Sequence, residues 1–185
     1  MIFFLKTPLV AAVLCLVTAN ISAADTPVTY TDNGRALFQF SVPDFWMVRT
    51  GGQREIEDTA VGDPRGVSRV IGMRPVTDDN VWMGFVSPQG VGDIEGGFQY
   101  LADIDKFLVK DPKVTSSGDT RIGGLPARVV RGTGKRDGRG VNFTATVIDL
   151  PQNRVAVAVA ILRDGADPEY ANDLNAVFAS FRPVR

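Results

Sequence analysis

The sequence predicts an α+β fold in which a mainly antiparallel β-sheet carries an amphipathic C-terminal helix on one face. The most informative stretch is Arg154–Arg163, RVAVAVAILR, in which valine and isoleucine alternate with alanine. A strand that is apolar on both faces belongs in the middle of a sheet. The alanine side of this strand leaves room for bulky side chains to pack closely. Residues 141–147, VNFTATV, alternate apolar and polar side chains and predict a second strand with one buried face.

The C-terminal helix is the other indication of the fold class. Asp167 is a favourable N-cap, and Pro168 suits the first helical position, where a missing N–H is tolerated. Pro183 would end the helix. The residues between the two prolines place apolar side chains on one helical face: Tyr170, Leu174, Val177, Phe178 and Phe181.

The upstream sequence predicts further strands and one more helix. A helix is expected at residues 98–110, because apolar residues recur there at helical spacing. Residues 134–140 should form a loop between two strands, with a turn at Asp137-Gly138. Residues 50–66, which are rich in glycine and charge, are expected to form a long mobile loop. The expected strands are residues 36–42, 46–49, 68–74, Val81–Val86 and 125–133.

The first 24 residues read as a signal peptide. Lys6 precedes an apolar run at residues 8–18, and small residues follow at Ser22, Ala23 and Ala24. Cleavage is expected after Ala24 or Ala23, so that residues 25–185 form a single domain in the periplasm or outside the cell. An uncleaved anchor is disfavoured because the apolar run is shorter than the roughly 20 residues that span a bilayer. A lipoprotein is disfavoured too, because Cys15 lies within the apolar run and follows leucine.

The composition excludes most catalytic and metal-binding schemes. The chain has no histidine, and its single cysteine lies in the predicted signal peptide. Most bases, nucleophiles and soft metal ligands that work near neutral pH are therefore missing. The formal net charge is −1, which gives no basic excess for nucleic acid. We accordingly predict no catalytic residues, no metal ligands, no cofactor and no nucleic-acid partner.

Three segments in order along the chain resemble the PsbP/Mog-like superfamily. Residues 38–48, FQFSVPDFWMV, resemble its strand–PxxW–strand entry, and residues 123–134, GGLPARVVRGTG, resemble its G-x-P-A strand. The chain closes with a helix ending in Ser-Phe-Arg at residues 180–182, like the terminal SFR of that group. The resemblance spans nearly all of residues 25–185 and is to the bacterial envelope branch, with proteins of the DcrB and LpqN kinds. It implies an α/β/α sandwich around a central antiparallel sheet.

The resemblance implies binding rather than catalysis. The superfamily includes the PsbP protein of the oxygen-evolving photosystem complex, a nuclear Ran-binding protein and bacterial envelope proteins. It supplies no catalytic motif to transfer onto this sequence. A fold that serves such different roles does not identify any one of them.

Candidate binding residues lie in two segments. The glycine-rich segment at residues 131–135 lacks the spacing and the following helix of a phosphate loop, and is interpreted as a hairpin tip. Charge there and in the long loop suggests contacts with a partner. Trp46 and Trp82 would indicate a partner site or an apolar pocket if both were exposed on one face. The candidate partner-binding residues are Arg54, Arg65, Lys135, Arg136 and Arg139.

The sequence leaves three functional hypotheses. The first is an exported, non-enzymatic protein that binds an envelope protein, another envelope component or a small ligand, without stable insertion into the membrane. The second is a carboxylate-based hydrolase such as a glycosidase, which requires only two suitably separated carboxyl groups in a cleft. The third is a hard-cation site built from carboxylates; Asp78 and Asp79 belong to a turn and lack the pattern of a calcium loop.

Overall fold

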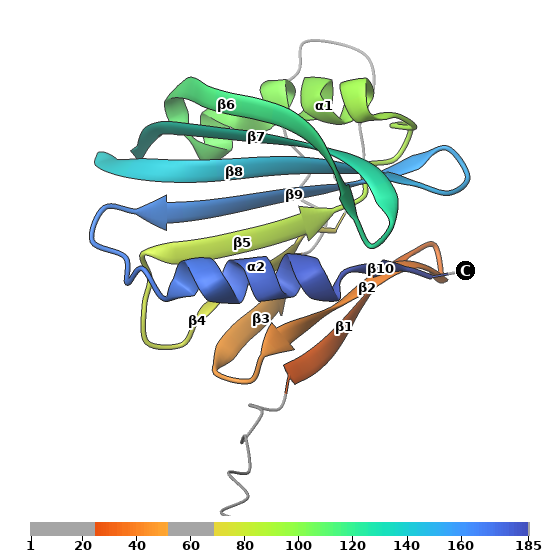
Figure 1. Ribbon diagram of the computed structural model, residues 1–185, viewed down its shortest axis with the longest axis horizontal. Helices are drawn as coiled ribbons and strands as arrows, with labels where there is room; N and C mark the ends of the chain where they lie inside the picture. The colour runs from red at the N-terminus through yellow and green to blue at the C-terminus, as the bar shows by residue number, and fades with distance from the viewer. Residues whose placement is uncertain (1–24, 52–68, 185) are drawn as a thin grey trace, which may run out of the picture.

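The computed structural model describes residues 25–51 and 69–184, which fold into two antiparallel sheets and two helices (Figure 1). The larger sheet has seven strands in the order β3-β4-β5-β9-β8-β7-β6, and the smaller has three in the order β1-β2-β10. The α+β class predicted from the sequence is therefore confirmed. The elements are β1 (Asp25–Asp32), β2 (Arg35–Pro43), β3 (Trp46–Thr50), β4 (Ile71–Pro75), β5 (Val81–Val86), α1 (Ile94–Leu108), β6 (Lys110–Ile122), β7 (Leu125–Arg136), β8 (Arg139–Leu150), β9 (Arg154–Arg163), α2 (Tyr170–Ser180) and β10 (Arg182–Pro183).

Strand β9 occupies the centre of the seven-stranded sheet, as its apolar sequence predicts. Its valines and Ile161 face α1, and its alanines face the opposite side. The alanine side packs against aromatic rings: Phe38 lies 5.1 Å from Phe181 between ring centroids, and Phe40 lies 4.4 Å from Phe85. Small side chains on the central strand allow these large rings to fill the core densely.

The outer layers differ from a simple α/β/α sandwich. Helix α1 packs on β6 to β9 on one side of the large sheet. On the other side, α2 packs mainly against β2, so the helix and the small sheet cover that face together (Figure 1). The sequence did not reveal this shared layer, because β1 and β10 were not predicted as strands. Neither helix among the described residues is long and apolar enough to cross a membrane.

The C-terminal helix begins later than its sequence suggests. Asp167 Oδ1 accepts a hydrogen bond from Glu169 N at 2.9 Å, and Tyr170 N donates to the Asp167 carbonyl at 3.1 Å. Asp167 therefore caps a tight turn, and Pro168 lies in that turn rather than at the first helical position. The helix also ends before Pro183, because Arg182 and Pro183 pair with β2 as β10. The predicted apolar face is confirmed: Leu174, Val177 and Phe181 are buried.

The first helix begins four residues earlier than predicted, at Ile94. Asp93 caps it, since its Oδ1 accepts a hydrogen bond from Gly96 N at 2.7 Å. The first turn was not predicted from the sequence because Gly96 and Gly97 have low helix propensity. Gly97 is required by packing: a Cβ there would lie 2.5 Å from Val147 Cγ1 on the sheet below.

The remaining elements show where the sequence pattern was incomplete. The expected loop at residues 134–140 is a two-residue turn at Asp137-Gly138, where both residues have positive φ, and the strands β7 and β8 extend to either side of it. Strand β6 was not predicted because it is an edge strand whose residues are almost all exposed and polar. Most of the predicted long loop, together with the predicted signal peptide, lies outside the described residues.

A largely buried ion pair links the small sheet to the large one. Arg154 at the start of β9 donates from Nη1 to Asp32 Oδ2 at 2.9 Å and from Nη2 to the carbonyl and hydroxyl of Ser87. Asp32 closes the β1–β2 hairpin, and Ser87 follows β5. The side chains of Arg154 and Asp32 are only 22% and 15% exposed, so solvent screens their attraction weakly.

Candidate functional site

Trp82 lies flat on the α1 side of the large sheet, over a floor of two glycines. A Cβ at Gly84 would collide with the benzo ring of this indole, and a Cβ at Gly72 would lie 3.3 Å from its Nε1. Gly72 and Gly84 are register partners on β4 and β5. The two missing side chains create the flat surface on which the indole rests. Trp82 itself remains half-buried.

Side chains of β3 and β4 surround this platform. Arg49 is the register partner of Gly72, and Met47 is the partner of Arg74. Because directly paired residues project to the same face of a sheet, Met47, Arg49 and Arg74 lie on the Trp82 side. Arg49 Nε donates to Met47 Sδ at 3.1 Å. The main contacts of α1 on this side of the sheet are with β6 to β9.

Arg136 completes the arrangement from the end of β7. Its guanidinium carbon lies 5.3 Å from the centroid of the Trp82 ring, a favourable cation–π geometry. Burial lowers the pKa of Arg136, and the nearby Arg163 lowers it further, while Asp137 acts in the opposite direction. Asp137, however, forms an ion pair with Arg163. Arg136 is therefore a half-buried cation whose nearest carboxylate is already engaged.

The charges of this surface do not balance. Arg74 forms an ion pair with Asp79, and Arg163 forms one with Asp137. Within the described part of the chain, Arg49 and Arg136 have no such ion pair. We call Met47, Arg49, Gly72, Trp82, Gly84 and Arg136 the Trp82 face. Counting only contacts among described residues, it joins two arginines without ion-pair partners to a half-buried indole.

The five predicted binding residues do not all come together. Arg136 reaches the Trp82 face, and Arg139 is its register partner across the β7–β8 turn. Lys135 is exposed and projects to the opposite side of the sheet, because successive side chains of a strand alternate. Arg54 and Arg65 lie outside the described residues. The sequence did not single out Arg49, Gly72 or Gly84; the only local signal was a tryptophan two residues before a glycine in a strand.

The two tryptophans lie on opposite faces, so they do not form a shared exposed site. Trp46 is 5% exposed in the core beneath α2, where it packs edge-on against Tyr170. Its Nε1 donates to Asp173 Oδ2 at 3.4 Å. Trp46 is therefore a structural residue, and only Trp82 is available to a ligand.

Several described carboxylates form ion pairs or caps that stabilise the fold. Asp32, Asp79 and Asp137 pair with arginines, and Asp93 and Asp167 cap turns or helices. Asp119 and Glu95 both contact Arg128, and this raises the pKa of the arginine. Within residues 25–51 and 69–184, no group of three or more potential metal-ligating side chains gathers in one place. These contacts give no support to a pair of catalytic carboxyl groups or to a cation site.

Comparisons with known proteins identify the fold. No family model and no curated protein matches the sequence. Among solved structures, LpqN of Mycobacterium tuberculosis, which is involved in cell envelope biogenesis, aligns with a TM-score of 0.51 at 17% identity, over 88% of this chain and 91% of LpqN.

Two further structures are similar at lower scores. The cyanobacterial PsbP protein of Synechocystis sp. PCC 6803 aligns with a TM-score of 0.47 at 12% identity, over 88% of this chain and 94% of its own. A putative regulator of unknown function from Pseudomonas aeruginosa, PA94, aligns with a TM-score of 0.46 at 11% identity, over 86% of this chain and 98% of its own. At these identities, structural similarity describes the fold alone. The chain therefore has the fold of LpqN, one of the protein kinds that its sequence motifs resemble.

Proposed function

We propose that this chain is an exported, non-enzymatic protein that binds another envelope component or a small ligand on the Trp82 face. The observation that carries the proposal is the unbalanced charge of this face, where Arg49 and Arg136 flank a half-exposed indole without ion-pair partners in the described part of the chain. Unpaired arginines beside an exposed aromatic ring are typical of recognition surfaces.

Two further observations support the proposal. LpqN, whose fold this chain shares, is involved in cell envelope biogenesis. The Trp82 face also lies beside the end of β3, since Arg49 directly precedes residues 50–66, the segment that the sequence predicts to be a long polar loop. Surfaces next to such loops, held by a rigid sheet, commonly carry recognition.

Export has its own test. We expect the exported protein to begin at Asp25 or Ala24, because the apolar run is short and small residues precede those positions. Intact-mass measurement of the protein recovered from the native host's envelope fraction checks this. Retention of residues 1–24 on the exported protein would contradict cleavage.

Binding is tested by affinity capture: the full-length gene is expressed in its native host, and the protein is recovered from the envelope together with whatever component it binds. We expect Arg49→Glu to lose the captured component, because the substitution reverses the charge of an arginine that has no ion-pair partner among the described residues. Arg49 is exposed, so the fold should tolerate the change.

Lys113→Glu is the matched control. It makes the same charge reversal at an exposed position on β6, at the far edge of the large sheet. We expect this variant to capture the component as the unsubstituted chain does. Equal capture by the Arg49 and Lys113 variants would remove the Trp82 face as the binding surface.

A further inference from the structure

Trp82 positions the guanidinium of Arg136, while its N–H donors make no hydrogen bond to another described residue. The guanidinium lies over the indole ring, and it also forms no ion pair with another described residue. A guanidinium carries five N–H donors in a planar fork, a geometry that matches the two oxygens of a carboxylate or a phosphate. The cation–π contact with the indole restrains this fork in advance, which lowers the entropic cost of binding an anion.

The electrostatic surroundings of Arg136 also favour an anion. Arg163 lies near enough to lower the pKa of Arg136, so the two cations repel each other. Asp137 relieves part of this repulsion, but it pairs directly with Arg163. A negatively charged group beside Arg136 would satisfy the half-buried cation, and partial burial strengthens that attraction relative to a fully exposed pair.

The rest of the Trp82 face supplies an apolar contact. Trp82 and Met47 are both half-buried, and the glycine floor keeps the surface between β4 and β5 flat. Arg49 provides a second cation on β3, on the same side of the sheet. A ligand could therefore place an oxyanion against Arg136 and an apolar body along Trp82 and Met47.

We propose that the Trp82 face binds a small amphiphile in which a phosphate or carboxylate group, held by Arg136, is attached to an apolar body. This inference rests on the proposed function, because it names the ligand class of the same surface. It commits to a single free molecule rather than a membrane: Arg136 is half-buried, so one group must reach in to meet it.

The fluorescence of Trp82 can be used to measure ligand binding at the Trp82 face. The chain has two tryptophans, so Trp46→Phe leaves Trp82 as the single indole. Fluorescence of this variant is followed during titration with dodecyl phosphate below its micellar concentration. Dodecyl maltoside, inorganic phosphate, and phosphatidylcholine vesicles with and without phosphatidylglycerol are titrated in parallel. Because Trp46 is buried, calorimetric titration of the unsubstituted chain provides a second readout that does not depend on the Trp46 variant.

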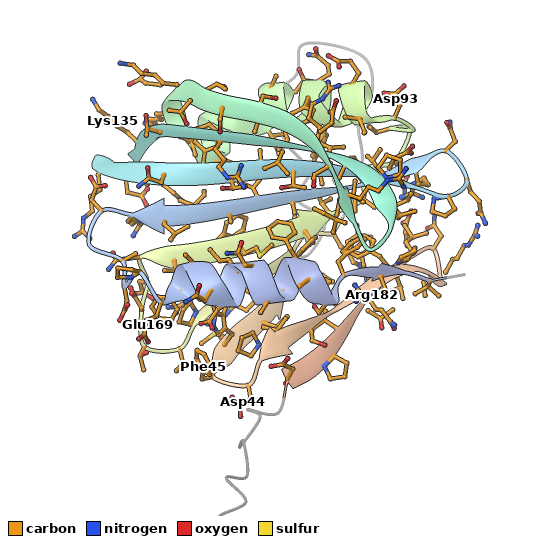
Figure 2. All side chains as sticks on the ribbon, viewed as in Figure 1. Asp44, Phe45, Asp93, Lys135, Glu169 and Arg182 are labelled. Atoms are coloured by element: carbon orange, nitrogen blue, oxygen red, sulfur yellow. The ribbon has the colours of Figure 1, made fainter. Side chains whose placement is uncertain are left out.

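Arg136→Gln and Lys135→Gln form the matched pair of variants. They remove the same charge from adjacent positions of β7, but only Arg136 lies on the Trp82 face; Lys135 is labelled at the exposed end of the strand in Figure 2. We expect Arg136→Gln to weaken binding of dodecyl phosphate at least about tenfold, and Lys135→Gln to change it by less than about twofold. Thermal denaturation of both variants verifies that they remain folded.

The outcomes separate this inference from the proposed function. Preference for dodecyl phosphate over the maltoside and over inorganic phosphate, lost in Arg136→Gln, supports the inference. Equal affinity for both detergents, equal loss in both variants, or binding to anionic vesicles alone overturns it. If envelope capture depends on Arg49 while no anionic probe binds, the proposed function stands and the anionic ligand is rejected.

Discussion

Val159→Asp is expected to destabilise the domain strongly. Val159 is 7% exposed on the central strand β9, where its register partners are Ala145 and Gly84 and where α1 covers the sheet. An aspartate there would be a buried charge without a partner, at a cost of about 3–5 kcal/mol. A natural domain has only about 5–15 kcal/mol of net stability, so this cost is a large share of it. Soluble expression and chemical denaturation measure the effect.

The same substitution on the surface provides the control. Val114 lies on the edge strand β6 and is 62% exposed. Val114→Asp keeps its carboxylate in water, so we expect a change in unfolding free energy of less than about 1 kcal/mol. If Val159→Asp also changed stability by less than this amount, β9 would not be the centre of the core.

Asp32→Ala is expected to lower the free energy of unfolding by about 2–3 kcal/mol. This is less than the roughly 3–5 kcal/mol for breaking a fully buried ion pair, because both side chains retain some exposure. The substitution leaves the Arg154 guanidinium largely buried and without its carboxylate. It also weakens the link between the β1–β2 hairpin and the large sheet. Arg154 already has a buried Nε without an acceptor, so it has little capacity to compensate. Urea denaturation followed by circular dichroism measures this change.

An exposed ion pair of similar length serves as the comparison. Asp119 Oδ1 accepts from Arg128 Nε at 2.8 Å, but the Asp119 side chain is 75% exposed. Water and salt screen this pair, so we expect no resolvable shift in the denaturation midpoint for Asp119→Ala. Equal midpoints for the Asp32 and Asp119 variants would show that the Asp32–Arg154 pair does not hold the two sheets together.

The strands with apolar periodicity were predictable because burial and sequence pattern coincide in them. Val81–Val86 and Arg154–Arg163 were predicted with their observed bounds. Strand β6 could not be predicted in this way: it lies at the edge of the sheet with its side chains in water, so no alternation of apolar and polar residues marks it. Its strand conformation comes from backbone pairing with β7.

The site was only partly accessible to sequence reasoning. Arg136 was a candidate because it lies in a charged hairpin, whereas Trp82 was named only together with Trp46, on the condition that both were exposed on one face. The contact between Arg136 and Trp82 could not be inferred from the sequence, since the two residues are 54 positions apart. Trp82 lies on β5 and Arg136 on β7, and two other strands separate β5 from β7 in the sheet. The roles of Gly72 and Gly84 depend on the register of β4 against β5, which local patterns do not specify.

The sequence by itself determined the fold class, the central strand and the apolar face of the last helix, because hydrophobic periodicity decides which side chains leave water. It also shows which side chains are missing, since the chain has no histidine and a single cysteine. The tertiary structure decided which tryptophan is available, which of the described arginines lack an ion-pair partner among the described residues, and how the small sheet shares a layer with α2. These features arise because strands that are distant in sequence pair with one another. The local sequence around each residue does not indicate such a contact.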